Sequence, residues 1–374
     1  MAAAQYDFSM LGVEFRVSAS DGSLLEYFHA FLDAYLDSER APPRSSSVLV
    51  SVRRGSIPRE RSESVVPVHR APSWPSWDLD AELHPAGAGV FAIWRSRGIS
   101  VNMDEARRDI QVVVADGISS NFAGEAVYIL CRNLSLYLRN GPSGNLLHAA
   151  GVVFGGKAIL FHGQSGSGKT TLMLHAIMNE GARPLTNDRA FISVDEKPMA
   201  YSWPSFITLC EGTILNNPPL RKGAEEYSAG KYPYRTLDWT APLEAVFRKD
   251  KKRLYPMHWL STCCQVKYSA AAPLGALVLP RLRDTDDPAD ITVCDLSNGT
   301  EREQLLKLMK EESFDGKENG LLPWHGLPLP TGTPPLEDLV DRIRTLRLPV
   351  YRVNLPARNL SPFRDVLQDI AARK

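Results

Sequence analysis

The sequence predicts a mixed fold, α/β to α+β, because short apolar strands and patterned helices follow one another along the whole chain. Residues 157–162, Lys-Ala-Ile-Leu-Phe-His, are short and apolar and are typical of a buried strand. Residues 171–178 carry apolar side chains at helical spacing, and Gly181 follows as a stop signal. Residues 122–138 form a longer helical pattern that ends before Asn140-Gly141-Pro142. No internal repeat is present, so a repeat architecture is not expected.

Residues 141–145 are rich in Pro, Gly and Ser, and we place a domain boundary there. Residues 1–140 are then an N-terminal α+β region, and residues 141–374 form a second domain. Prolines and tryptophans interrupt residues 71–85, which are expected to lack regular structure. The other elements expected in the N-terminal region are strands at 11–17, 48–52, 90–94, 99–103 and 110–114, the last three as an antiparallel meander, and helices at 24–36 and 122–138.

In the second domain, a strand over 146–154 is expected to form a hairpin with residues 157–162 across Gly155-Gly156. A single strand is expected over residues 183–194, with a polar triplet inside it, and residues 216–256 are polar and Pro-rich. The remaining expected elements are strands at 275–280 and 349–355 and helices at 301–312, 336–346 and 362–372.

The strongest motif is Gly163-Gln-Ser-Gly-Ser-Gly-Lys-Thr170, which fits G-x-x-x-x-G-K-[ST], with a strand pattern before it and a helix pattern after it. Glycines let the backbone N–H groups of such a loop turn toward a phosphate. Lys169 would reach the β- and γ-phosphates, and the Thr170 hydroxyl would join the Mg²⁺ shell. The residues expected to bind the nucleotide are Gly163, Ser165, Gly166, Ser167, Gly168, Lys169, Thr170 and Thr171.

Phosphoryl transfer also needs a carboxylate near Mg²⁺ and a group that takes the proton of the acceptor. Asp188 is the candidate for the carboxylate, because an Asp within an otherwise apolar strand needs a partner. A turn residue that pairs with Arg189 is the alternative. His148 would come near the loop if its strand forms the expected hairpin, although a single His in a strand is more often a core residue.

These segments together resemble the HPr kinase/phosphorylase family and its relatives, which share a nucleotide fold with phosphoenolpyruvate carboxykinase. The resemblance rests on Leu147-His148-Ala149-Ala150-Gly151-Val152-Val153, on residues 163–171 and on Asn187-Asp188-Arg189. It covers residues 146–220 and continues only in outline beyond them. It implies that residues 141–374 are an HPr-kinase-like, ATP-binding kinase domain, in which Asp188, His148 and Lys169 are catalytic and Thr170 and Asp188 meet Mg²⁺.

In that family the triplet is usually Asp-Asp-Arg, whereas this chain has Asn187 at its first position. Asn forms hydrogen bonds but does not accept a proton at neutral pH. Asp188 must therefore act as the carboxylate, or His148 must help, or the acceptor differs. We expect an ATP-dependent kinase that phosphorylates a serine hydroxyl of a protein or peptide. The alternatives are a nucleotide-binding sensor or scaffold that has lost catalysis, and a small-molecule kinase.

Composition narrows the expected partners and location. Lys plus Arg and Asp plus Glu are 43 each, and this zero net charge favours neither nucleic acid nor a membrane surface as a partner. No apolar run approaches the length of a membrane span, and the start lacks a signal-peptide pattern. Together with five cysteines that show no metal spacing, this predicts a cytoplasmic protein with reduced thiols. The oligomeric state stays open, a homo-oligomer included.

Two further features have a structural and a functional interpretation. Residues 248–253, Arg-Lys-Asp-Lys-Lys-Arg, are a basic run, either a solvated loop or a lid that brings cations to the transferred phosphate. An aromatic group precedes it and would stack adenine, grip a peptide or simply pack; it comprises Tyr227, Tyr232, Tyr234 and Trp239.

Overall fold

The structure is a computed structural model, and it describes residues 3–35, 47–57, 66–67, 81–86, 89–94, 98–104, 106, 108–139, 144–193, 196–232, 241–246, 251–311 and 335–373. Contacts between Cα atoms divide the described chain into two units. The N-terminal unit ends before residue 143, and the C-terminal unit begins there and also includes residues 34 and 35.

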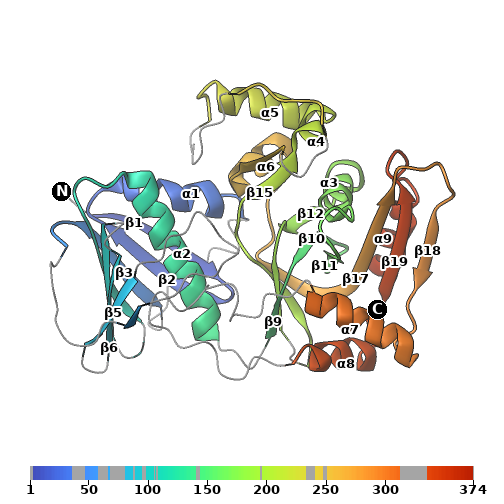
Figure 1. Ribbon diagram of the computed structural model, residues 1–374, viewed down its shortest axis with the longest axis horizontal. Helices are drawn as coiled ribbons and strands as arrows, with labels where there is room; N and C mark the ends of the chain where they lie inside the picture. The colour runs from blue at the N-terminus through green and yellow to red at the C-terminus, as the bar shows by residue number, and fades with distance from the viewer. Residues whose placement is uncertain are drawn as a thin grey trace. The chain divides into compact units, whose positions relative to one another are not determined.

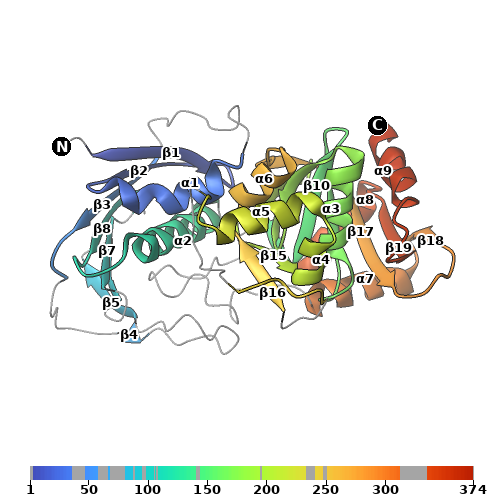
Figure 2. The same ribbon diagram turned by 90° about the horizontal axis from the view of Figure 1, so that it is seen from above.

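In its described part, the N-terminal unit is an eight-stranded sheet in the order β1-β2-β3-β8-β7-β6-β5-β4. Two helices lie side by side over it (Figure 2). Phe28 and Phe31 of the first helix pack on Tyr128 of the second, and Phe28 also contacts Phe8 of the sheet. The elements are β1 (Ala4–Met10), β2 (Val13–Ala19), a 3-10 helix (Gly22–Leu25), α1 (Glu26–Leu32), β3 (Val48–Arg54), β4 (Val66–Pro67), β5 (Ala81–Ala86), β6 (Gly89–Trp94), β7 (Ile99–Met103), β8 (Asp109–Val114) and α2 (Ser120–Arg139).

The predicted meander and the helix over 122–138 are confirmed, because β6, β7 and β8 pair in antiparallel order and α2 follows them. The strand predicted over 11–17 is β2, which begins two residues later because Leu11 and Gly12 have φ of 52° and 78° and form the turn of a hairpin. One prediction for this unit is wrong. Residues 81–85, expected to be irregular, belong to β5, where Pro85 lies near the end of the pairing with β6, whereas residues 71–80 lie outside the described chain.

The C-terminal unit, within its described residues, contains a nine-stranded sheet in the order β12-β10-β11-β17-β14-β13-β9, with β19 and β18 added beside β17, and a small pair formed by β15 and β16 (Figure 1). The elements are β9 (Gly144–Leu147), β10 (Ala149–Phe154), β11 (Lys157–His162), α3 (Lys169–Glu180), β12 (Arg183–Thr186), β13 (Ala190–Ser193), β14 (Met199–Ser202), β15 (Ile207–Cys210), α4 (Glu211–Leu215), α5 (Pro218–Ser228), β16 (Lys252–Tyr255), α6 (Met257–Cys264), β17 (Ala271–Arg283), β18 (Asp290–Val293), α7 (Gly299–Glu311), α8 (Leu336–Thr345), β19 (Val350–Pro356) and α9 (Phe363–Ala372).

Helices cover both faces of the C-terminal sheet. On one face α7 and α8 lie together (Figure 1), and Met309 and Ile343 join one apolar cluster with Leu160 of β11. The next residue of β11, Phe161, points to the opposite face because side chains alternate along a strand, and it contacts Phe363 of α9. Glu180 of α3 pairs with Arg364 of α9 at 2.7 Å, so α3 shares that face. Both sheets mix parallel and antiparallel pairs, and the predicted mixed α/β class is confirmed.

Two strands predicted in this unit are each divided by a polar residue of the expected site. The strand over 146–154 splits at His148 into β9, which pairs with β13, and β10, which forms the predicted hairpin with β11. The strand over 183–194 splits into β12 and β13, and Asn187-Asp188-Arg189 lie in the bend between them. The triplet therefore connects two strands and is not part of one. Among the described residues, no helix is both long and apolar enough to cross a membrane.

Candidate functional site

Polar segments of the C-terminal unit gather at the sheet edge where β11, β12, β17 and β19 end. β17 is parallel to both β11 and β19, so these three strands end at the same edge. β10 is antiparallel to β11 and to β12, so β12 also ends there and β10 begins there. Ligands of open α/β sheets bind at the carboxyl ends of such strands. This carboxyl edge carries residues 148, 163–171 and 187–189, the residues expected from the sequence to form the site.

The loop after β11 has the backbone that its glycines predict. Gly166 and Gly168 have φ of 89° and 105°, which side chains rarely allow. A Cβ atom on Gly168 would lie 2.3 Å from the side chain of Leu282, so a larger residue does not fit without a shift. The N–H of Leu282 donates to the carbonyl of Ser167 at 3.0 Å and ties the loop to β17. α3 then starts at Lys169, so the N–H groups of a helix start adjoin the loop and favour an anion there.

Lys169 is buried at the start of α3, and its ammonium group is held by the loop itself. Its Nζ donates to the carbonyl of Gly163 and, at 3.1 Å, to that of Gln164. A buried ammonium group needs such acceptors, because an unpaired charge away from water is costly. Of the other residues expected to bind the nucleotide, Gly163 is buried, Ser165 and Gly166 are exposed, and Ser167, Gly168, Thr170 and Thr171 are partly buried.

Asp188 lies between two basic side chains. Its Oδ1 is 3.5 Å from His148 Nε2, and its Oδ2 is 3.5 Å from Arg189 Nε. His148 stands at the start of β10, and its carbonyl lies 3.1 Å from Nδ1 of His162, the residue before Gly163. The Asp188 side chain is 39% exposed, whereas that of Arg189 is 4% exposed. The carboxylate therefore has two basic neighbours, stays accessible to solvent and is linked through His148 to the base of the loop.

The oxygen atoms at this edge suit Mg²⁺ in kind. Among the described residues, no hydrogen bond joins Asp188 to Thr170, and no group of three or more His, Cys, Asp or Glu side chains is placed to hold a metal. Mg²⁺ usually needs only one or two protein ligands, because phosphates and waters complete its shell. Two further oxygens, Asn187 Oδ1 and Ser167 Oγ, are buried and have no hydrogen-bond partner among the described residues. Both are therefore able to form a hydrogen bond with a ligand.

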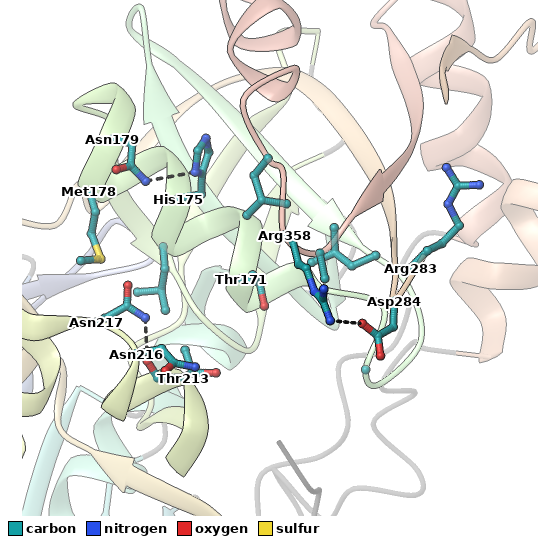
Figure 3. Close-up of a pocket in the computed structure, with 16 residues that line it drawn as sticks. Thr171, His175, Met178, Asn179, Thr213, Asn216, Asn217, Arg283, Asp284 and Arg358 are labelled. Atoms are coloured by element: carbon teal, nitrogen blue, oxygen red, sulfur yellow. Dashed lines mark hydrogen bonds and ion pairs between the residues drawn. The ribbon is translucent and has the colours of Figure 1, made fainter. Parts of the chain in front are cut away.

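A cavity of about 800 Å³ opens beside the loop, on the outer side of α3 (Figure 3). This size is within the usual range for small-molecule sites. Gly166 and Gly168 form its loop end, and the ends of β17 and β19 form an adjoining wall with Asp284 and Arg358. The two remaining walls come from α3, with Thr171, Leu174, His175 and Met178, and from α4 and the residues after it, with Thr213, Asn216 and Asn217.

Neutral polar groups line the part of the cavity farther along α3. The Asn179 amide donates to Nδ1 of His175 at 3.0 Å (Figure 3). Burial lowers the pKa of His175, although the nearby Glu180 opposes the shift, so the ring is neutral at pH 7. The Asn217 amide donates to the carbonyl of Thr213 at 2.6 Å. This end therefore offers amide and imidazole groups over an apolar floor, which suits a ligand portion without charge.

The wall formed by α4 depends on a buried ion pair that the sequence did not indicate. Glu211, the first residue of α4, accepts from Arg253 Nε at 2.8 Å and from the N–H of Glu244 at 2.7 Å. Arg253 also donates to the carbonyls of Ala241 and Pro242. Both charged side chains are less than 10% exposed. Arg253 is thus a structural residue and not the solvated or lid residue expected from the basic run, of which residues 248–250 lie outside the described chain.

The aromatic group before the basic run also has a structural role where the structure describes it. Tyr227 is fully buried, and its ring packs against those of Tyr232 and Tyr255 at centroid distances of 5.6 and 5.2 Å. The hydroxyl of Tyr232 lies 2.9 Å from Nδ1 of His258. The packing interpretation therefore applies to Tyr227 and Tyr232, whereas Tyr234 and Trp239 lie outside the described residues. All five cysteines are free thiols.

Comparison with known proteins gives no family for this chain. No protein-family model matches it, and no curated protein matches it either. The functional assignment therefore depends on the residues and their geometry.

Proposed function

We propose that the chain is an ATP-dependent kinase with an HPr-kinase-like core, which transfers the γ-phosphoryl group to an acceptor hydroxyl, a serine of a protein or peptide. The observation that carries the proposal is the phosphate-loop motif in the order strand, glycine loop, helix, at the carboxyl edge where the pair of Asp188 and His148 also lies. A glycine loop alone is compatible with any anion. Phosphoryl transfer to a hydroxyl also needs a carboxylate near Mg²⁺ and a group that accepts the proton, and Asp188 and His148 are groups of these kinds.

Each residue of the carboxyl edge then has a defined task. The loop N–H groups and Lys169 would hold the β- and γ-phosphates. Thr170 and Asp188 would hold Mg²⁺, which supplies charge neutralisation at the transferred group. Asp188 or His148 would accept the acceptor proton as the new bond from its oxygen to phosphorus forms and the bond to ADP breaks. Their separation of 3.5 Å lets either one support the other in that step.

The cavity beside the loop supports a nucleotide over inorganic pyrophosphate as the phosphoryl donor. It extends from Gly166 and Gly168 to the amides of Asn179 and Asn216, and its volume of about 800 Å³ exceeds what a phosphate chain alone would fill. Its neutral end provides hydrogen-bonding groups and apolar contact for a base and ribose. We therefore assign the loop end to the phosphates and the end lined by α3 and α4 to the nucleoside.

A lysine substitution tests the proposal directly. Lys169→Ala removes the cation that would contact the transferred phosphate, so ATP-dependent phosphorylation should fall by about a hundredfold or more. Transfer is followed with γ-labelled ATP and by mass spectrometry of candidate peptides and metabolites. Lys307→Ala is a matched control, because Lys307 is 78% exposed on α7, which covers the opposite face of the sheet from α3. Wild-type turnover by the Lys169→Ala protein would refute the kinase assignment.

One observation favours a second function, that of a nucleotide-binding sensor or scaffold. Asn187 occupies the position where the family that the chain resembles has a carboxylate, and its Oδ1 has no hydrogen-bond partner within the part of the chain that the structure describes. A nucleotide-binding sensor or scaffold would bind ATP in calorimetry, with affinity lost in Lys169→Ala, yet give no labelled product with any acceptor. The kinase proposal requires labelled product, so the same two measurements separate the functions.

A further inference from the structure

The ends of β17 and β19 place a second cation, Arg358, beside the loop, although it lies far from the loop in the sequence. The two strands are parallel, and Arg283 of β17 is in register with Pro356 of β19. Asp284 follows Arg283 directly and Arg358 comes two residues after Pro356, so both stand at the carboxyl edge. The hydrogen bond from Leu282 N–H to the Ser167 carbonyl fixes this end of β17 against the loop. Sequence position gives no hint of this neighbourhood.

Arg358 has its guanidinium group at the phosphate end of the cavity. Figure 3 shows it between Thr171, at the start of the loop helix, and Asp284, while the amides of Asn179 and Asn216 lie at the other end. The cavity therefore has its charged groups, Arg358 and Asp284 among them, beside the loop and neutral groups along α3. Once Asp284 no longer contacts Arg358, this arrangement suits a molecule that carries its negative charge at one end.

The ion pair of Arg358 leaves its guanidinium available to a ligand. Its Nη2 is 4.0 Å from Asp284 Oδ1, and the two side chains are 81% and 92% exposed. A long pair in such an exposed place adds almost nothing to stability, because water screens it and both side chains must be ordered. Guanidinium groups bind phosphate oxygens in pairs of parallel hydrogen bonds, which is a stronger arrangement. A phosphate beside Thr171 would therefore compete successfully with Asp284 for Arg358.

The neighbouring arginines of β17 do not share this orientation. The side chain of Leu282 packs beneath Gly168, and alternation along the strand directs Arg281 and Arg283 to the other side. Figure 3 shows the Arg283 guanidinium turned away from Thr171, and its Nη2 donates to the carbonyl of Pro288 at 2.8 Å. Arg281 is exposed and does not line the cavity. Only Arg358 among these three is directed to the loop end of the cavity.

We propose that Arg358 binds the polyphosphate of the nucleotide opposite Lys169, exchanging its contact with Asp284 for one with phosphate. This inference rests on the proposed function and adds to it a phosphate-binding residue that lies outside every matched motif. Lys169 would act from the side of the loop and Arg358 from the side of β19. Two cations, one from the loop helix and one from the segment after β19, would neutralise the charge that accumulates on the phosphates during transfer.

Nucleotide titrations of the full chain test this assignment. ATP with Mg²⁺, ADP with Mg²⁺ and adenosine are titrated calorimetrically into the wild type, Arg358→Gln and the matched control Arg281→Gln. Arg358→Gln should weaken ATP binding about tenfold or more and leave adenosine binding unchanged, because only the phosphates contact the guanidinium. Arg281→Gln removes the same charge and should change ATP binding less than about twofold. Asp284→Asn should tighten ATP binding up to about threefold, because it removes the competitor.

The outcomes separate this inference from the kinase proposal. Equal ATP affinity for Arg358→Gln and Arg281→Gln, with binding lost in Lys169→Ala, would overturn the role of Arg358 alone. A wild type that binds no nucleotide would overturn both. If Arg358→Gln weakened adenosine binding as much as ATP binding, the assignment of Arg358 to the phosphates would be wrong, because the arginine would then contact the nucleoside. The thermal midpoints of Arg358→Gln and Arg281→Gln are expected to equal that of the wild type, since both side chains are exposed.

Discussion

Glu211 and Asp188 are carboxylates of the C-terminal unit that each lie beside an arginine, and their surroundings differ. Glu211 is buried, contacts Arg253 at 2.8 Å and accepts a further hydrogen bond from the N–H of Glu244. Asp188 is 39% exposed, and its contacts with His148 and Arg189 are both 3.5 Å long. The first carboxylate has all its partners inside the protein. The second has weak partners and a side open to solvent.

This difference separates a structural carboxylate from one that a ligand can use. Burial alone would raise the pKa of Glu211, but hydrogen bonds from Arg253 and from the Glu244 N–H lower it below its ordinary value. Glu211 is therefore ionised, and its oxygens are already hydrogen-bonded within the protein. It anchors α4, which forms one wall of the cavity. Asp188 keeps lone pairs available for a metal ion or a proton.

The largest expected effect is on the buried pair. Arg253→Ala leaves the Glu211 carboxylate without its counter-ion, and removing one partner of a buried pair costs about 3–5 kcal/mol of folding free energy. Two carbonyls, those of Ala241 and Pro242, lose their donor as well. Urea unfolding followed by circular dichroism measures the loss.

Lys251→Ala is the matched control for that variant. Lys251 pairs with Glu244 at 2.6 Å, but the two side chains are 39% and 53% exposed. An exposed pair contributes about 0–1 kcal/mol, so this variant should unfold close to the wild type. Equal losses of unfolding free energy in Lys251→Ala and Arg253→Ala would show that burial does not distinguish the two pairs, and would contradict the structural role assigned to the pair of Glu211 and Arg253.

Lowering the pH is expected to reduce the contribution of Glu211 to folding stability by a smaller amount. The folded pKa of Glu211 lies below its ordinary value of 4.5, so its ionised form stabilises the fold fully above pH 4.5. That contribution is lost as the pH falls from 4.5 through the folded pKa. Glu211→Gln should therefore cost about 1–3 kcal/mol at pH 7 and progressively less below pH 4.5. Unfolding free energies of the two proteins, measured from pH 7 to pH 3, give the difference, and a constant gap over that range would contradict the assignment.

The sequence predicted those parts of the fold and site that are encoded locally. The helices that became α2, α7, α8 and α9 were indicated by the spacing of their apolar residues, and the loop by its glycines and Lys169. Where polarity interrupts a strand, periodicity misled, as at His148 and at Asn187-Asp188-Arg189. A strand pattern cannot show that its two halves pair with different neighbours, because that choice depends on the whole sheet.

Other parts of the site come together only through the fold. Glu211 and Arg253 are 42 residues apart, and nothing in the local sequence of either predicts burial. Arg358 lines the same cavity as the loop because β17 and β19 are parallel and in register, which depends on strand pairing. A basic residue just after a strand is common, so the sequence offered no signal for it. The local signal for this site is the presence of polar residues directly after strands. That signal becomes informative when the strand order is known, because it then shows which of these residues gather at one edge of the sheet.

The smallest expected change in stability is at Asp188. Asp188→Asn keeps the size of the side chain, and its contacts are long and partly exposed, so the free energy of unfolding should change by less than about 0.5 kcal/mol. Under the proposed function, phosphoryl transfer should nevertheless fall by about a hundredfold or more, because the amide neither binds Mg²⁺ as a carboxylate does nor accepts a proton. Asp365→Asn, on the exposed side of α9, is the control and should change neither quantity. A large loss of stability in Asp188→Asn would show that Asp188, like Glu211, is a structural residue. Its carboxylate would then be needed by the fold itself and would not be left available for a ligand.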